Sequence, residues 1–151
     1  RGVSRVAGMY CLAVKNRVLF FADATVNIDP TAEELADIAL STAHVCEKHF
    51  DMEPRVAMIS FSNFGSVRHE FAEKMARAAE IARSRRPDLI IDGEMAPDTA
   101  LVPEIADAYF PESQIRGDAN VLIFPDVQSG NISLKLVQHL AGGEVIGPIL
   151  M

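Results

Sequence analysis

The sequence predicts an α/β fold, a three-layer α/β/α domain with a mostly parallel sheet. Short apolar runs alternate along the chain with longer segments of helical periodicity, as in domains with crossover helices. Three of the runs, Val56–Phe61, Leu89–Ile91 and Val121–Phe124, end at polar loops that contain glycine. Continuous apolar runs are typical of buried parallel strands, and the loops at their carboxyl ends form the ligand-binding edge of such sheets. We therefore expect the three loops to meet at one binding mouth.

Six strands are expected from runs of strand-forming residues bounded by turn residues. In order, they are Val6–Val14, Val18–Ala22, Arg55–Phe61, Leu89–Ile91, Val121–Phe124 and Val145–Leu150. The first two are separated only by Lys15-Asn16-Arg17, which predicts an antiparallel, hairpin-like pair. The others alternate with helices, which favours parallel pairing.

Helices are expected where apolar residues recur at spacings of three and four. They cover Ala32–Phe50, Arg68–Arg83, short pieces across Ala100–Tyr109, and Ile132–Leu140. The first helix has two candidate starts: Asp29 could cap it with Pro30 in the first turn, or Thr31 could cap it with Glu34 returning the bond. In the second helix, Phe71 is expected to face inward together with Met75.

Size and composition narrow the class of protein. A chain of 151 residues with 49% hydrophobic residues can bury one core, so we expect a single domain. The formal charge of −7 argues against binding to nucleic acid, which needs clustered Lys and Arg. No apolar run is long enough to span a membrane, and no signal peptide is recognised. Two cysteines without a Cys-x-x-Cys spacing favour a reducing, cytoplasmic location.

The polar loop after the first central strand is the strongest candidate binding element. It holds Ser60, Ser62, Asn63, Gly65 and Ser66. Small residues with free backbone N–H groups and hydroxyls can hold a phosphate or a thioester carbonyl. The alternative is structural, with Ser66 capping the next helix and Gly65 forming a tight turn. The sequence patterns of nucleotide-binding loops are absent.

Three carboxylates form a second set of candidates, Asp92, Glu94 and Asp126. Asp92 and Glu94 could act as a general base with its partner or bind a divalent metal, or they could accept backbone N–H bonds from a neighbouring loop. Asp126 or Ser129 could cap the following helix, where an anion would also be stabilised. The four histidines have no metal-ligand spacing, so we expect no metal and assign no catalytic residue.

Several ordered motifs resemble the phosphate acetyl/butyryltransferase family over Val6–Met151. The motifs are Phe20-Phe21-Ala22-Asp23, Val26–Glu34, Ser60–Ser66, Pro87–Glu94, Val121–Asp126 and Ser129-Gly130-Asn131-Ile132. The resemblance implies the second domain of the phosphotransacetylase fold, so we expect residues 1–151 to be an inserted second domain whose flanking first-domain segments are missing. It also implies acetyl-CoA as ligand.

Within this family, Asn63-Phe64 and the segment Ile146–Met151 resemble the C-terminal region of hybrid NADP-dependent malic enzymes. That resemblance implies a domain that binds acetyl-CoA as a regulator and self-associates into a dimer or higher oligomer. Malate would be oxidatively decarboxylated, with NADP and a divalent metal, by an absent N-terminal part. In this leading interpretation, the Ser60–Ser66 loop forms one side of the acetyl-CoA site, and Asn131 and His139 line the opposite side.

Two alternatives remain open. In the first, the chain is part of an active phosphate acetyltransferase, which converts acetyl-CoA and phosphate into acetyl phosphate and CoA. The family resemblance implies a Ser-Arg-Gly motif with a catalytic Asp beyond Met151, where this chain stops, and an Arg where this chain has His139. We take both departures to favour binding over catalysis, since an imidazole is a weaker phosphate ligand than a guanidinium. In the second alternative, the domain only mediates dimerisation.

Overall fold

The computed structural model describes residues 5–151, so the first four residues of the predicted domain 1–151 lie outside it. The strands are β1 (Gly8–Val14), β2 (Arg17–Ala22), β3 (Arg55–Ile59), β4 (Ile90–Met95), β5 (Val121–Ile123) and β6 (Glu144–Leu150). The helices are α1 (Ala32–Phe50), α2 (Glu70–Arg85), α3 (Pro97–Leu101), α4 (Pro103–Tyr109) and α5 (Val127–Leu140).

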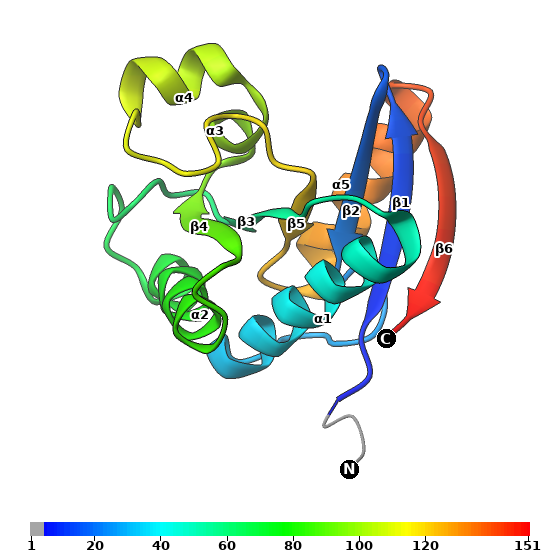
Figure 1. The fold of residues 1–151 in the computed structure, drawn as a ribbon, viewed down its shortest axis with the longest axis horizontal. Coiled ribbons are helices and arrows are strands. Elements are labelled where there is room, and N and C mark those ends of the chain that lie inside the picture. Colours follow the sequence, from blue (N-terminus) through cyan, green and yellow to red (C-terminus); the bar gives the residue numbers. More distant parts are fainter. Residues whose placement is uncertain (1–4) are drawn as a thin grey trace.

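One six-stranded sheet runs through the molecule in the order β4-β3-β5-β2-β1-β6 (Figure 1). The pairs β4–β3, β3–β5 and β5–β2 are parallel, whereas β1 is antiparallel to both of its neighbours. The carboxyl ends of β2, β3, β4 and β5 therefore lie at the same edge. This arrangement confirms the predicted α/β fold with its mostly parallel sheet.

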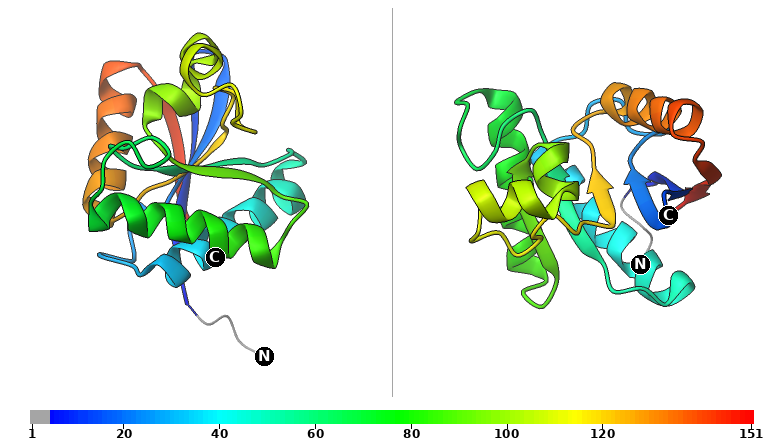
Figure 2. Two further views of the ribbon diagram at one scale, coloured as in Figure 1. Left: turned by 90° about the vertical axis from the view of Figure 1, so that its left-hand side faces the viewer. Right: turned by 90° about the horizontal axis from the view of Figure 1, so that it is seen from above.

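Successive residues of the central strands enter two different cores, which explains the continuous apolar runs. Phe20 packs into the core beneath α1 and α2, whereas Phe21 packs into the core on the other face. In β3, Met58 likewise packs into the first core and Ile59 into the second. Figures 1 and 2 show α1 and α2 on one side of the sheet, with α3, α4 and α5 on the other. The domain is thus the three-layer sandwich expected from the sequence.

Local signals set the start of α1. Thr31 is the N-cap: its side chain accepts a bond from the amide of Glu34, and the Glu34 carboxylate accepts one from the amide of Thr31. This capping box satisfies two N–H groups that the helix leaves without partners. Of the two predicted starts, the one at Thr31 is the one observed.

The antiparallel part of the sheet brings the ends of the described chain together. Lys15 and Asn16 both have positive φ, as a two-residue type I′ turn requires, and they join β1 to β2 as predicted. The predicted last strand is β6, which pairs with β1. Just beyond these strands, Ala7 and Met151 exchange two backbone hydrogen bonds, of 3.2 and 2.9 Å. The two ends of residues 7–151 are therefore neighbours.

The segment Asp92-Gly93-Glu94 is not the loop that the sequence predicts, because it continues β4 as far as Met95. Gly93 allows this continuation: it lies opposite Met58 in the parallel ladder, and a Cβ atom there would come within 2.7 Å of the Met58 carbonyl oxygen. Its φ of 141° also favours glycine. The polar residues Asp92 and Glu94, which were expected to follow the strand, are thus part of it.

Other boundaries shift by a few residues. β3 ends at Ile59, two residues before the predicted end, although the amide of Ser60 still donates to the Met95 carbonyl at 2.9 Å. The last helix starts at Val127, five residues before the predicted start, because Asp126 caps it. Within residues 5–151, no helix combines the length and the apolar character needed to cross a membrane.

Candidate functional site

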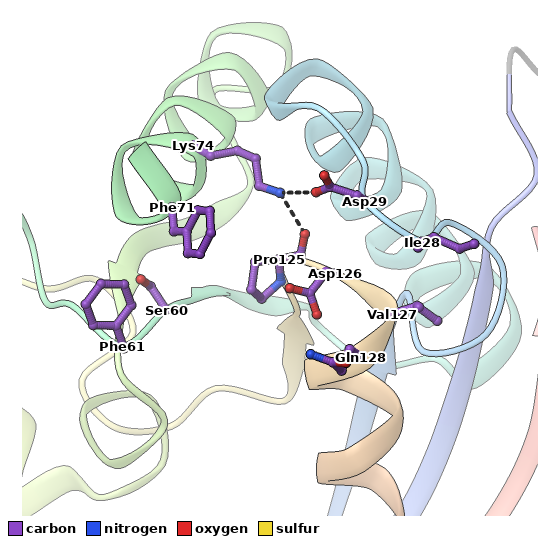
Figure 3. A pocket seen from close by; sticks show the side chains of 10 residues that line it. All are labelled: Ile28, Asp29, Ser60, Phe61, Phe71, Lys74, Pro125, Asp126, Val127 and Gln128. Carbon is purple, nitrogen blue, oxygen red and sulfur yellow. Dashed lines mark hydrogen bonds and ion pairs between the residues drawn. The ribbon is translucent and has the colours of Figure 1, made fainter. Parts of the chain in front are cut away.

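A pocket of about 340 Å³ opens at the carboxyl edge of the parallel strands. Its walls come from the β2–α1 loop, the β3–α2 loop, the first turns of α2, and the β5–α5 loop with the start of α5 (Figure 3). The lining residues are Ile28, Asp29, Ser60, Phe61, Phe71, Lys74, Pro125, Asp126, Val127 and Gln128. The predicted position at this sheet edge agrees with the structure, and among the predicted site residues Ser60 and Asp126 line the pocket.

Asp126 is the N-cap of α5. Its Oδ1 accepts a bond of 2.7 Å from the amide of Ser129, and its carbonyl oxygen accepts one from the Ser129 hydroxyl at 3.1 Å. The amide of Val127 donates to the carbonyl of Ile28 at 3.1 Å. Of the two capping candidates, Asp126 is therefore the one used. Its carboxylate already interacts with the positive end of the helix dipole.

The start of α5 is fastened to the loop after β2. Gly130 is required here, since a Cβ atom would lie 2.9 Å from the carbonyl oxygen of Asp23. Asp23 is buried, and its carboxylate accepts bonds from the amides of Thr25, Val26 and Asn27. The Asn131 side chain donates to the Ala24 carbonyl at 3.2 Å. Asn131 thus connects α5 to this loop and lies outside the pocket lining.

Hydrogen bonds within the β3–α2 loop use most of its polar side chains. The Ser62 hydroxyl accepts a bond from the amide of Val67 at 3.0 Å and lies 3.2 Å from the Ser66 hydroxyl. Ser66 Oγ also accepts a bond from the amide of Asn63 at 3.0 Å, and Asn63 Oδ1 accepts one from the amide of Ala96 at 2.8 Å. These three side chains shape the loop, and none of them lines the pocket.

Ser60 is the serine of this loop that lines the pocket. Its Oγ accepts a bond of 3.3 Å from the amide of Ser62, so its hydroxyl hydrogen remains able to donate to a ligand. The structural alternative for Ser66 is wrong, because α2 is capped by His69, whose Nδ1 accepts a bond of 3.1 Å from the amide of Phe71.

Asp92 and Glu94 both accept hydrogen bonds from neighbouring backbone amides, which is one of the roles predicted for them. Asp92 accepts bonds from the amides of Gly93 and Gln114 and from the Arg83 guanidinium, at 3.0, 3.2 and 3.3 Å. Glu94 is buried, and its Oε1 accepts a bond of 3.1 Å from the amide of Gly65.

The single mouth is confirmed for two of the three loops, because the β3–α2 and β5–α5 loops share the pocket of Figure 3, but it is wrong for the segment Asp92-Gly93-Glu94, which opens onto other pockets. Asp92 lines a pocket of about 400 Å³ next to Phe64 and Phe110. Glu94 and Gly65 line another, of about 310 Å³. Neither shares a residue with the pocket of Figure 3.

His139 lies exposed in the last turn of α5. It is 12 positions after Val127, so the helix rise places it about 18 Å from the pocket end of α5. The structure therefore does not bring His139 into the pocket, and its assignment to an acetyl-CoA site stays a prediction.

Eight of the ten lining residues were not among the predicted site residues, and four of them, Ile28, Asp29, Phe71 and Lys74, come from segments to which the sequence assigned no binding role. Phe71 was expected to point inward, but it is 62% exposed because it lies in the first turn of α2, at the rim of the pocket. Phe71 and Lys74 are three positions apart and therefore lie on the same face of the helix. This spacing was the one signal in the sequence that could have indicated their shared role.

Lys74 is the cation of the pocket. Its Nζ donates to Asp29 Oδ1 and to the carbonyl oxygen of Pro125, both at 3.0 Å (Figure 3). Asp126 brings a second carboxylate, so the lining carries two acidic groups and one ammonium group. Among residues 5–151, no cluster of three or more His, Cys, Asp or Glu side chains is arranged to hold a metal ion.

The sheet and its flanking helices define a three-layer α/β/α domain with a pocket at the carboxyl edge of its parallel strands. The family described as Phosphate acetyl/butaryl transferase matches residues 1–151, and the chain belongs to this family. It is 46% identical to the phosphate acetyltransferase of Clostridium acetobutylicum, over 98% of this chain and 46% of that protein. It is 52% identical to that of Thermoanaerobacterium thermosaccharolyticum, over 92% of this chain and 42% of that protein.

A solved structure supports the same grouping. The crystal structure of a phosphotransacetylase from Streptococcus pyogenes superimposes with a TM-score of 0.94 at 46% identity, covering 99% of this chain and 46% of that one. The chain thus spans just under half the length of these relatives.

These similarities correct the leading interpretation of the sequence. The relatives that match nearly the whole chain are phosphate acetyltransferases, so the interpretation as a regulatory domain of an NADP-dependent malic enzyme is wrong. NADP and the divalent metal expected in an absent part lose their support together with it. The Asn63-Phe64 pair and the segment Ile146–Met151 were too short to decide between branches of one family. The transferase alternative is the better supported interpretation.

Proposed function

We propose that this chain is part of a phosphate acetyltransferase and forms one wall of the site where an acetyl group passes between CoA and phosphate. The observation that carries the proposal is the pocket in which Ser60, Lys74 and Asp126 meet at the carboxyl edge of the sheet. Its setting in a chain that resembles phosphate acetyltransferases over almost all its length supports acetyl-CoA as substrate.

The reaction makes simple demands on the protein. A phosphate oxygen attacks the thioester carbonyl carbon, a C–O bond forms, the C–S bond breaks, and the proton lost by phosphate is taken up by the departing thiolate. Negative charge develops on the carbonyl oxygen, so a hydroxyl donor held in place beforehand stabilises the transition state. We assign that role to Ser60, which the loop fixes and whose hydrogen is free to donate.

Ser62, Asn63, Gly65 and Ser66 would act indirectly by holding Ser60. Their hydrogen bonds close the loop and tie it to the end of β4. Phe61, Phe71 and Pro125 add apolar surface that would exclude water from the reacting thioester. The rest of the site would be formed by the part of the protein outside this chain.

We further propose that CoA extends along α5, with its phosphates near His139. The pocket and His139 lie at opposite ends of this helix. Along the helix axis, Val127 and His139 are about 18 Å apart, a distance comparable with the length of an extended CoA molecule. Asn131, about one turn into α5, would hold the helix against the loop after β2 through its bond to the Ala24 carbonyl.

Residues 1–151 are further proposed to form an inserted domain. The pairing of Ala7 with Met151 supports this, because a domain whose ends are neighbours can be accommodated within a loop of another domain. If the proposal holds, the isolated chain should unfold in one cooperative transition; two separate transitions would contradict it.

Self-association, predicted from the family resemblance, is proposed to use α5. Ile132, Leu136 and Leu140 are all exposed, and their spacing of four residues puts them on one stripe of the helix. Sedimentation of the full-length protein with Leu136→Glu should show dissociation compared with wild type. An unchanged sedimentation coefficient would exclude this stripe as the contact.

The activity is tested on the full-length protein that contains this chain. With acetyl-CoA and phosphate, we expect acetyl phosphate, trapped as a hydroxamate, and free CoA thiol in equal amounts. CoA release without acetyl phosphate would indicate hydrolysis instead, and the proposed function would then be wrong.

A further inference from the structure

We infer that Lys74 is a positioning residue whose ammonium group holds the β5–α5 loop, and with it Asp126, in the geometry that the pocket needs. The inference rests on the proposed function and adds a residue to its site. Nζ of Lys74 lies 3.0 Å from the carbonyl oxygen of Pro125 and 3.0 Å from Asp29 Oδ1 (Figure 3). The side chain is only 22% exposed, so it is held between these groups.

The Pro125 carbonyl has a special place in the chain. It precedes the N-cap of α5, so it lies before the first carbonyl of the helical ladder, which is that of Asp126 bonded to the amide of Gly130. Its partner in the structure is Lys74, which arrives from a different helix, 51 positions away. Without this donor, nothing in α2 would hold the residue that leads into Asp126. The bond therefore holds the backbone that leads into Asp126, whose carboxylate is in turn held by the amide of Ser129.

The charge of the pocket gives Lys74 a second task. Asp29 and Asp126 are both lining residues, and Lys74 is the single cation among the ten residues that line this pocket. Phosphate and CoA are anions, which two uncompensated carboxylates would repel. An ammonium group has three N–H donors, and two of them serve Asp29 and Pro125. The third can be offered to an oxygen of the ligand.

Four variants of the full-length protein separate this role from that of a simple ion pair. Lys74→Met removes both bonds and the charge. Lys74→Arg keeps a cation. Asp29→Asn breaks the ion pair but leaves the bond to Pro125. Arg77→Met removes an exposed cation one turn further along α2, outside the pocket, and serves as the control.

For Lys74→Met we expect kcat to fall by roughly tenfold to a hundredfold, because the reacting groups lose their alignment. The KM for phosphate should rise, and the rise should shrink in high salt, since salt screens the remaining carboxylates. Lys74→Arg should recover the KM more than the kcat, because its guanidinium supplies the charge in a different geometry. Asp29→Asn should cause a smaller loss than Lys74→Met, and Arg77→Met should match wild type.

Hydrogen exchange of the backbone amides supplies a readout that needs no activity. In Lys74→Met, the amides of residues 127–130 should exchange about tenfold faster, because the start of α5 opens more easily. Equal losses of kcat in Asp29→Asn and Lys74→Met would show that Lys74 acts only through its ion pair with Asp29. Unchanged hydrogen exchange in Lys74→Met would exclude a positioning role. If wild type makes no acetyl phosphate, the proposed function fails on its own, and the exchange result still decides the role of Lys74.

Discussion

The buried carboxylate of Glu94 accepts a hydrogen bond of 3.1 Å from the amide of Gly65, across 29 positions of sequence. The bond joins the end of β4 to the loop that carries Ser60. Glu94 is 3% exposed, so replacement by a smaller apolar residue leaves the Gly65 amide without its partner.

Glu94→Ala should therefore lower the free energy of unfolding by roughly 1–3 kcal/mol. Urea unfolding of the variant measures the loss, and Glu104→Ala, at an exposed position on α4, is the matched control. If both variants unfold at the same urea concentration as wild type, the bond contributes nothing to stability.

Gly93→Ala should be among the most damaging single changes in the sheet. The added Cβ would approach the Met58 carbonyl oxygen to 2.7 Å, in a backbone conformation with φ of 141°. We expect a loss of roughly 3 kcal/mol or more, from strain together with overpacking. Gly142→Ala isolates the backbone part, because Gly142 also has positive φ but has open space around it, and it should cost about 1 kcal/mol. Similar melting temperatures for the two variants would contradict this account.

Ser60→Ala should reduce the kcat for acetyl phosphate formation by about a hundredfold, the usual cost of losing a donor to the developing oxyanion. The loop should stay folded, since Ser62 and Ser66 keep their own bonds. Ser84→Ala removes a hydroxyl at the far end of α2 and should leave the rate unchanged. A Ser60→Ala enzyme with the wild-type rate would exclude the hydroxyl from the reaction.

His139→Arg should tighten acetyl-CoA binding by roughly twofold to fivefold if the CoA phosphates lie at the end of α5, since an exposed ion pair contributes up to about 1 kcal/mol. Calorimetry at two salt concentrations measures it, and the gain should shrink at the higher one. His44→Arg adds the same charge on α1, on the other face of the sheet, and should leave the affinity unchanged. An equal gain in both variants would show a general charge effect and remove His139 from the site.

Burial raises the pKa of the Cys46 thiol to about 12, with smaller contributions from Cys11 and Glu47. The folded state therefore holds this proton more tightly than the unfolded state, so stability should be constant below pH 9 and fall between about pH 9 and 12. Unfolding measured across this range should show a shallower decline in Cys46→Ala. Both cysteines are buried and free, so neither should react with a thiol reagent at pH 8 until the protein unfolds.

Local patterns predicted most of the fold because they depend on near neighbours. Thr31 and Glu34 are three residues apart, so their capping box can be read directly from the sequence. Alternation of strands and helices was enough to predict the parallel sheet. The prediction failed at Gly93, whose place in β4 depends on its fit against Met58 on another strand. A glycine between two acidic residues looks like a turn in the sequence, and nothing near it in the chain indicates that it packs against another strand.

The candidate site was harder to predict for the same reason. Ser60 directly follows β3 and Asp126 comes three residues after β5, so their position at the pocket follows from sheet topology. Asp29 and Lys74 are 45 positions apart and share no motif, and only the packing of α2 beside the β2–α1 loop brings them together. The polar residues Ser62 and Asn63 look like ligand groups in the sequence, yet their hydrogen bonds are made within the protein.

The paired ends of the sheet also make this domain suited to circular permutation. Ala7 and Met151 exchange two backbone hydrogen bonds, a geometry that holds their Cα atoms about 5.5 Å apart. A linker of a few residues could join them, and new termini could be opened at the Lys15-Asn16 turn. Such a permutant would retain every element of the sheet while changing the order in which β1 and its two partners are synthesised. Its refolding rate would report how much folding depends on the early closure of the β1–β2 hairpin.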